Sequence, residues 1–181
     1  MGVPDAAAPH IVREVEEVAR CLPAPRVFLG EEATESVLRR HGATSRFVHI
    51  ATHGRFRHDN PMFSSVQLGT SRLSLFDLYQ LELPAELVTL SGCGTGLNVA
   101  EGGDELLGLV RGLLYAGTQS ALVTLWDVSD SSTSEFMSRF YACLGEGQDK
   151  GVALQRATIE LRERHPHPYY WAPFVLVGRG V

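Results

Sequence analysis

The ten residues Leu87–Gly96, LVTLSGCGTG, join a short apolar run to a glycine-rich turn. The run ends at Ser91 and has the length and composition of a buried β-strand, and Cys93 follows it between two glycines. A cysteine that only fills space in a core is expected inside such a run. Cys93 is instead expected in the loop that leaves the strand, which is where ligands bind in open parallel sheets.

Similar apolar runs recur on both sides of this stretch, and segments with helical periodicity lie between them. The strand candidates are 26–29, 46–51, 120–126 and 172–178, and residues 61–74 predict a small hairpin. The helix candidates are 11–22, 34–40, 75–81, 104–116 and 152–164. Ser132 and Glu135 have the spacing of a capping box that opens a further helix ending at Gly145. This alternation predicts an α/β fold with a mainly parallel sheet flanked by helices.

Length and composition indicate one soluble domain over residues 1–181. The chain is 44% hydrophobic, which suffices for one substantial core, and its formal charge is −5 with scattered Lys and Arg. Direct binding to nucleic acid or to an anionic membrane is therefore not expected. No apolar run approaches the roughly 18 residues of a membrane span, and the N-terminus lacks signal-peptide features. A cytoplasmic location is the prediction.

The three cysteines do not predict a disulfide framework, because their number is odd and the chain is of medium length. Cys21 and Cys143 fall on helical segments and are expected to pack in the core. Four histidines could suggest a metal site but lack the spacing of metal ligands: His49, His58, His165 and His167. No metal and no cofactor are predicted.

His53 supplies the second half of a reactive pair. It follows the strand candidate 46–51 as Cys93 follows 87–91. If the two strands are neighbours in a parallel sheet, their carboxyl ends lie at the same edge of that sheet. An imidazole beside a thiol raises its reactivity and can protonate a leaving amine, a contribution of roughly 10²–10⁴-fold. Glycines beside both residues, Gly54 among them, leave backbone N–H groups for an oxyanion. The loop lacks the Lys-Ser or Lys-Thr of a P-loop and the Arg of a cysteine phosphatase.

With these residues the chain resembles the CHAT domain, a caspase-like peptidase family related to caspases and separases and often found downstream of tetratricopeptide repeats. The matching blocks, in the family's order, are FVHIATHGRF, LSLFDLYQLELPAELVTLSGCGTG, GLVRGLLYAGTQSALVTLWDVSD, FMSRFYACL and HPYYWAPFVLVG. The resemblance implies a three-layer caspase-like fold and peptide-bond hydrolysis by a dyad at His53 and Cys93. It also implies an oxyanion hole from backbone groups near Gly54 and Cys93.

Two features depart from the family pattern. Family members commonly have Ala before the cysteine and an acidic residue after it, whereas this chain has Gly92 and Gly94. In related domains further strands precede residues like Val3-Pro4-Asp5. We therefore expect the C-terminal, catalytic portion of a longer protein, lacking N-terminal strands, with a sheet edge that a homodimer or another partner would cover.

Specificity is expected to depend on Asp127 and Asp130 in the segment LWDVSD, which resembles a separase segment. One of them would line the S1 pocket and favour a basic residue before the cleaved bond; alternatively, Asp130 only caps the following helix. The sequence thus predicts a cysteine endopeptidase for protein or peptide substrates, regulated by a repeat domain or partner protein. An inactive or conditionally active interaction module is the alternative, and a small-molecule acyl hydrolase is the third possibility.

Overall fold

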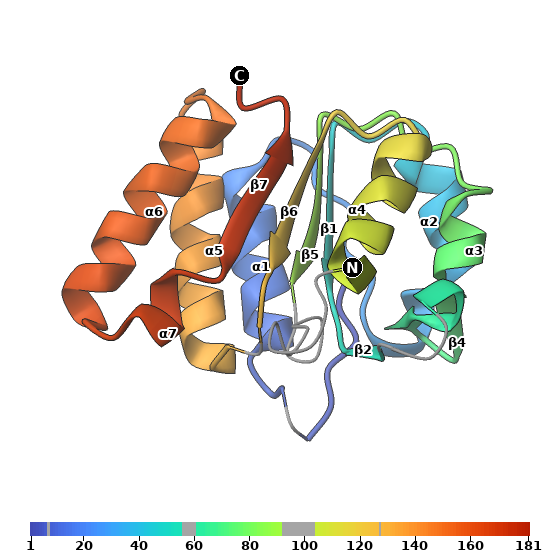
Figure 1. Ribbon diagram of the computed structural model, residues 1–181, viewed down its shortest axis with the longest axis horizontal. Coiled ribbons are helices and arrows are strands. Elements are labelled where there is room, and N and C mark those ends of the chain that lie inside the picture. The colour runs from blue at the N-terminus through green and yellow to red at the C-terminus, as the bar shows by residue number, and fades with distance from the viewer. Residues whose placement is uncertain (7, 56–60, 92–103, 127) are drawn as a thin grey trace.

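A central sheet between two layers of helices forms the body of the molecule (Figure 1). The computed structural model describes residues 1–6, 8–55, 61–91, 104–126 and 128–181. The sheet has the order β1-β5-β6-β7. Strands β1 (Phe47–Ala51), β5 (Leu87–Ser91) and β6 (Ser120–Thr124) are parallel, and β7 (Phe174–Gly178) pairs antiparallel with β6. The predicted α/β fold with a mainly parallel sheet is confirmed.

The helices form two layers because alternate strand residues point to opposite faces of the sheet. Helices α2 (Glu35–Gly42), α3 (Leu75–Leu78) and α4 (Asp104–Tyr115) cover the face that carries Val48 and Val88. Helices α1 (Ile11–Cys21), α5 (Asp130–Gly145) and α6 (Lys150–Arg164) cover the face that carries Leu87 and Leu122. The short α7 (Pro168–Trp171) leads into β7. Apolar side chains on both faces explain why the strands read as nearly continuous apolar runs.

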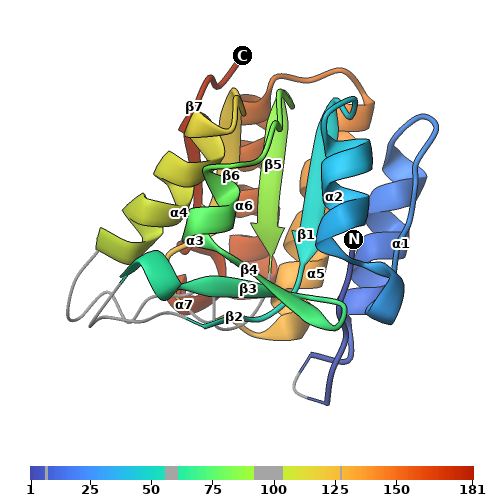
Figure 2. The same cartoon turned by 90° about the vertical axis from the view of Figure 1, so that its right-hand side faces the viewer.

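A second, three-stranded sheet lies at the carboxyl end of β1 (Figure 2). It contains β2 (Gly54–Arg55), β3 (Ser65–Leu68) and β4 (Ser71–Ser74), and the 3₁₀ turn η2 (Pro61–Phe63) precedes β3. The β3–β4 pair is antiparallel and confirms the predicted hairpin. Gly69 adopts a φ of +46° in its turn, where a Cβ would meet the Glu31 carbonyl at 2.9 Å.

The predicted capping box at Ser132 and Glu135 is wrong. Helix α5 begins two residues earlier, at Asp130, and the Ser132 hydroxyl donates to the Ser129 carbonyl at 2.9 Å instead of receiving a backbone N–H. Ser132 is fully buried inside the first turns of the helix. A polar residue within a helix can mimic the cap spacing when it bonds back to an earlier carbonyl.

The segment 26–29, predicted as a strand, contributes only a single bridge. Gly2 lies between Leu29 and Ala51 and bridges to both in the parallel sense. The backbone N–H of Gly2 donates to the Phe28 carbonyl at 2.9 Å, and that of Val3 donates to the Ala51 carbonyl at 3.0 Å. The sheet edge expected to be exposed is therefore paired along the carboxyl end of β1, beside the 3₁₀ turn η1 (Gly30–Glu32).

A buried polar cluster lies between the sheet and helices α1 and α5. Glu14 of α1 and His49 of β1 are 1% and 8% exposed, and Glu14 Oε1 lies 2.8 Å from His49 Nε2. The His49 ring meets Tyr141 edge-on, and the Tyr141 hydroxyl lies 2.8 Å from the Thr89 hydroxyl. Burial lowers the pKa of His49, so its imidazole is neutral and Nε2 donates to the carboxylate. His49 Nδ1 has no hydrogen-bond partner within the described residues.

This cluster predicts that stability falls as the pH drops below about 6.5. An unfolded His49 takes up a proton near its ordinary pKa of 6.5, whereas the folded one, with its lowered pKa, stays neutral. The unfolded state then binds more protons, so the free energy of unfolding decreases by up to about 1.4 kcal/mol per pH unit toward the folded pKa. Urea unfolding at several pH values should show this slope, and His49→Gln should remove it.

Two comparisons separate the contribution of His49 to this slope from the contributions of other groups. The Met1 amino group, whose pKa burial lowers from 8.0 to about 6, adds a slope of the same sign between those values. Only the difference between wild type and His49→Gln therefore reports on the histidine. Tyr141→Phe keeps the Glu14–His49 contact and should keep the slope. A His49→Gln profile that parallels the wild type below pH 6.5 would contradict the prediction.

Candidate active site

The candidate site depends on the register in which β1 pairs with β5. Each residue of β1 pairs with the residue 40 positions later, from Phe47 with Leu87 to Ala51 with Ser91. His53 and Cys93 have this same offset and follow the two strands at equal distance in sequence. Cys93 itself lies outside the described residues. The predicted adjacency of the two strands, on which the dyad hypothesis rests, is confirmed.

Backbone contacts on two sides hold the segment that carries His53. The Thr52 N–H donates to the Ser91 carbonyl at 2.7 Å, which extends the pairing of β1 with β5 by one residue. The Gln67 N–H donates to the His53 carbonyl at 2.9 Å, and the Thr52 hydroxyl donates to the Gln67 carbonyl at 2.7 Å. Thr52 and His53 therefore link the main sheet to the small sheet, with Thr52 bonded to both and His53 bonded to the small one.

Asp5 contacts the His53 ring, a role that was not predicted from the sequence. Asp5 Oδ1 lies 3.1 Å from His53 Nε2 and also accepts the Ala8 N–H at 3.0 Å. The His53 side chain is 24% exposed and that of Asp5 is 52% exposed. A carboxylate at one ring nitrogen orients an imidazole and stabilises the cation that forms when the other nitrogen takes a proton. In the sequence Asp5 is identified only as part of Val3-Pro4-Asp5, and no local pattern indicates its contact with a residue 48 positions away.

Asp130 uses its carboxylate to hold another helix. Its Oδ2 accepts the His10 N–H at 2.7 Å, so the first turn of α5 is joined to the start of α1. It makes no capping bond to its own helix, whose N-cap residue Ser129 has no side-chain cap. Its proposed S1 partner Asp127 lies outside the described residues. Gly54, predicted to supply an oxyanion donor, begins β2 opposite Val66.

The other two cysteines have the surroundings of unreactive thiols. Cys143 is fully buried in α5, as predicted. Cys21 is half-buried, its Sγ donates to the Glu17 carbonyl at 3.3 Å, and burial raises the pKa of its thiol. A raised pKa reduces the thiolate fraction, which is the nucleophilic form.

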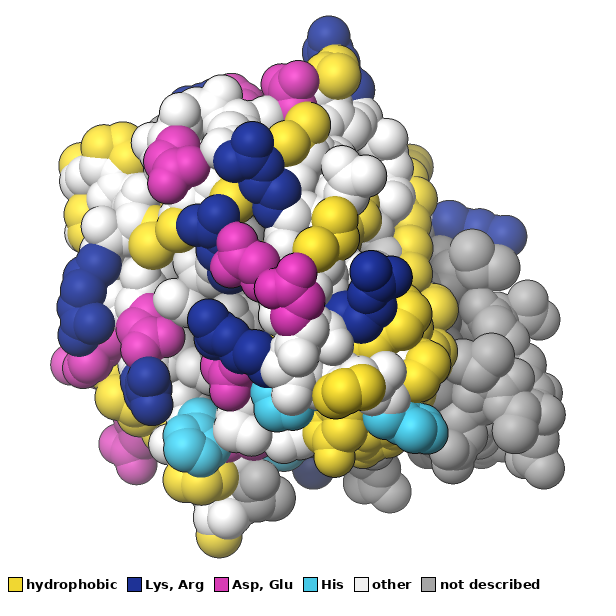
Figure 3. All heavy atoms as spheres, turned by 90° about the vertical axis from the view of Figure 1, so that its left-hand side faces the viewer, with side chains coloured by type: hydrophobic (Ala, Val, Ile, Leu, Met, Phe, Trp, Pro, Cys, Tyr) yellow, Lys and Arg dark blue, Asp and Glu magenta, His cyan; other side chains and the backbone are white. Residues whose placement is uncertain are grey.

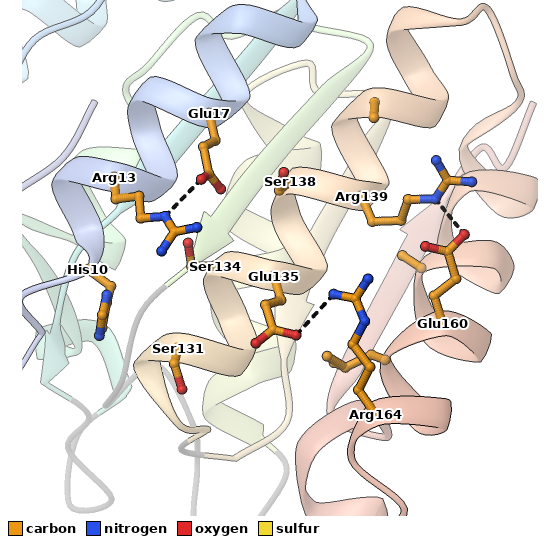
Figure 4. Close-up of a pocket in the computed structure, with 13 residues that line it drawn as sticks. His10, Arg13, Glu17, Ser131, Ser134, Glu135, Ser138, Arg139, Glu160 and Arg164 are labelled. Atoms are coloured by element: carbon orange, nitrogen blue, oxygen red, sulfur yellow. Dashed lines mark hydrogen bonds and ion pairs between the residues drawn. The ribbon is translucent and has the colours of Figure 1, made fainter.

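A groove of about 430 Å³ lies away from His53, across the outer surface of α1, α5 and α6 (Figure 4). Its charged side chains pair with one another, and Figure 3 shows basic and acidic side chains interspersed on this face of the molecule. The three pairs are Arg13 with Glu17 at 2.8 Å, Arg139 with Glu160 at 2.7 Å and Arg164 with Glu135 at 3.4 Å. Such mutual pairing leaves the groove without an excess charge that would attract an ionic ligand.

The described ranges contain no group of three or more His, Cys, Asp or Glu side chains that could hold a metal ion. None of their helices is long and apolar enough to cross a membrane.

Comparison with known proteins agrees with this architecture. Gingipain R (RGPB), an Arg specific cysteine proteinase, superposes with a TM-score of 0.73 at 12% identity, over 99% of this chain and 45% of that one. The caspase-like fold is thereby confirmed. Tetratricopeptide repeat protein 28 of Homo sapiens and of Mus musculus are each 34% identical over 111 residues. That match spans 60% of this chain and only 4% of either relative.

The family model that matches is described as the CHAT domain, and the match runs over nearly the whole chain. It begins at residue 2 and ends at residue 179, so it includes both strand ends discussed above. The chain therefore belongs to the CHAT domain family.

Proposed function

We propose that this CHAT domain is a cysteine endopeptidase. The Cys93 thiol gives its proton to His53 and its sulfur attacks the carbonyl carbon of the scissile peptide bond. His53 then passes the proton to the leaving amine as the C–N bond breaks, which leaves a thioester on Cys93. Water, deprotonated by His53, hydrolyses the thioester and regenerates the thiol. Backbone N–H groups near Gly54 and Cys93 stabilise the oxyanion in both steps.

The single observation that carries this proposal is the contact between Asp5 and His53 at the end of a strand paired in register with the cysteine strand. The Asp5 carboxylate holds the His53 ring in one orientation at this edge of the sheet. Here the carboxylate prepares His53 to accept a proton at the other nitrogen. The register provides a reason for the equal spacing of His53 and Cys93 after β1 and β5.

The proposed substrate preference depends on the charge of two carboxylates. Asp127 and Asp130 are proposed to favour a basic residue before the cleaved bond, because carboxylates attract the cation of Lys or Arg. Gingipain R, which shares the fold, is Arg specific. For Asp130 this role has to coexist with the bond to the His10 N–H, which uses Oδ2 and leaves Oδ1 for a substrate.

Regulation by a repeat domain completes the proposal. The relatives are tetratricopeptide repeat proteins, and the matched region is a small part of their length. Control of the protease by such repeats, or by a partner protein or a second copy, is proposed on this basis. A cytoplasmic setting, which keeps thiols reduced, fits three cysteines without a disulfide framework.

Labelling with a thiol-reactive peptide probe that carries Arg at P1 tests the function. We expect one labelled site, lost in Cys93→Ala and weakened in His53→Ala, because a neutral thiol without its base reacts slowly. Mass spectrometry of the labelled peptides identifies the residue. Cys21→Ala is the matched control and should label as well as the wild type.

The alternatives give different results in the same assay. Equal labelling of all three cysteines would favour an interaction module without an activated thiol. Turnover of esters but not of peptides would favour a small-molecule acyl hydrolase. A preference for Asp or an aliphatic residue at P1 would overturn the proposed S1 pocket while leaving the dyad in place.

A further inference from the structure

A cavity of about 330 Å³ opens at the amino end of β1, the opposite end of that strand from His53. Its walls are the loop that follows α1 and the end of α2, both near the top of Figure 2. The volume lies at the lower end of the roughly 300–1,000 Å³ typical of small-molecule sites. Its lining, all of it described, contains no Asp and no Glu, and its basic members are Arg26, His41, Arg46 and His49.

Arg26 brings an uncompensated charge to this cavity. Its Nη1 lies 2.7 Å from His41 Nδ1, and because arginine cannot accept, the histidine nitrogen must be the acceptor. The His41 ring is therefore uncharged in this contact, with its proton on Nε2. No carboxylate within the described residues forms an ion pair with Arg26. The arginines of the groove in Figure 4, by contrast, all face a glutamate.

Aromatic rings contact two of the basic side chains of the cavity, His41 and Arg46. The Phe28 ring stacks on His41 with 5.2 Å between centroids and 17° between planes. The Arg46 guanidinium lies 4.8 Å from the centre of the Phe47 ring, and its ion pair with Glu86 uses Nε. These contacts hold the basic groups in place before a ligand arrives, which reduces the entropy lost on binding.

The loop between α1 and Arg26 is held in a strained shape. Ala24, between Pro23 and Pro25, has a φ of +50° and is the one non-glycine residue in the described chain with a positive φ. A Cβ makes this conformation unfavourable, and such strain is retained at sites where a particular loop shape is needed. The two prolines restrict the loop on both sides of it. The strained residue lies in the wall of the cavity.

We infer that this cavity binds a phosphate monoester that also contains a planar aromatic ring, as a nucleoside monophosphate does in its base. Arg26 and Arg46 receive the phosphate, because guanidinium groups match its geometry and charge. The ring packs against the apolar walls formed by Phe28, Phe47 and the two prolines. The site is separate from His53, and the inference does not depend on peptidase activity.

Calorimetric titration of chain 1–181 with adenosine 5′-monophosphate tests the inference. Any tag belongs at the C-terminus, because Met1 also lines the cavity. Binding is expected, and adenosine alone and inorganic phosphate alone should each bind about tenfold or more weakly. Arg26→Gln should weaken adenosine monophosphate binding by about tenfold or more, since a charge-assisted bond is lost.

Arg13→Gln is the matched control, because this exposed arginine lies in the other groove and pairs with Glu17. It should bind like the wild type. Arg46→Gln is a second variant that should weaken binding, and melting curves establish that each variant is folded. No binding of the monophosphate at millimolar concentration, or equal binding by Arg26→Gln, would overturn the inference. Equal affinity for inorganic phosphate would overturn the part that concerns the ring.

Discussion

Replacing Cys93 with Ala is expected to lower kcat/KM for an Arg-containing peptide by at least about 10⁴-fold, because no other group can form the thioester. His53→Ala should lower it by about 10²–10⁴-fold, the usual contribution of a general base. Single-turnover and steady-state rates on a fluorogenic peptide measure both effects. The double variant should be no worse than Cys93→Ala, since residues that act as a unit are not additive.

Asp5→Asn separates orientation from charge in the same assay. Asparagine keeps the shape of the side chain at His53 but removes its charge. The Asp5 side chain is 52% exposed, and exposed ion pairs contribute up to about 1 kcal/mol, so a loss near fivefold in kcat/KM is expected. A loss of kcat/KM as large as that of His53→Ala would show that catalysis depends on the Asp5 charge as strongly as on His53. Unchanged activity in both Cys93→Ala and His53→Ala would overturn the dyad.

His49→Ala is expected to destabilise the fold by about 3–5 kcal/mol, because it leaves the buried Glu14 carboxylate without its partner. Glu14→Ala should cost only about 1–3 kcal/mol, since it orphans a neutral imidazole N–H. The asymmetry arises because burial lowers the pKa of His49. Urea unfolding at about pH 8 measures both, and there the Met1 amino group, with a pKa of about 6, is uncharged.

The double replacement Glu14→Leu with His49→Leu is the control for that experiment. Removing both partners and filling the space should cost less than the sum of the single alanine variants, because neither polar group remains unpaired. The reverse order, with Glu14→Ala costing more than His49→Ala, would mean that His49 carries a charge in the folded protein.

The strands and most helices could be predicted because each is decided by local pattern. Leu87–Ser91 is mostly apolar and is buried throughout, since both of its faces are covered, and Thr34 caps α2 by accepting the Val37 N–H. The start of α5 could not be predicted in this way. Ser132 and Glu135 have the spacing of a capping box, but the N-cap residue of the helix is Ser129. Local pattern cannot decide between two polar residues that both suit a helix start.

The candidate site was predictable to the extent that it lies on strand ends. His53 stands out because it follows an apolar run and precedes a glycine. Asp5 does not stand out, because its contact with His53 spans 48 positions in the sequence and depends on the packing of Ala8 and α1 against the sheet. The link between Asp130 and the His10 N–H spans 120 positions and gives no local signal either. Long-range contacts of single side chains appear only when the fold is known.

The constant offset of 40 between β1 and β5 limits how this chain can change in length. Inserting or deleting one residue within either strand would turn every following side chain to the opposite face, with Val48 or Val88 exchanged for a polar neighbour. The same event would change the sequence offset of 40 between His53 and Cys93, which now equals the register of the two strands. Lineages of this domain are therefore expected to gain and lose residues outside these two strands, so that one constraint protects both the core and the proposed chemistry.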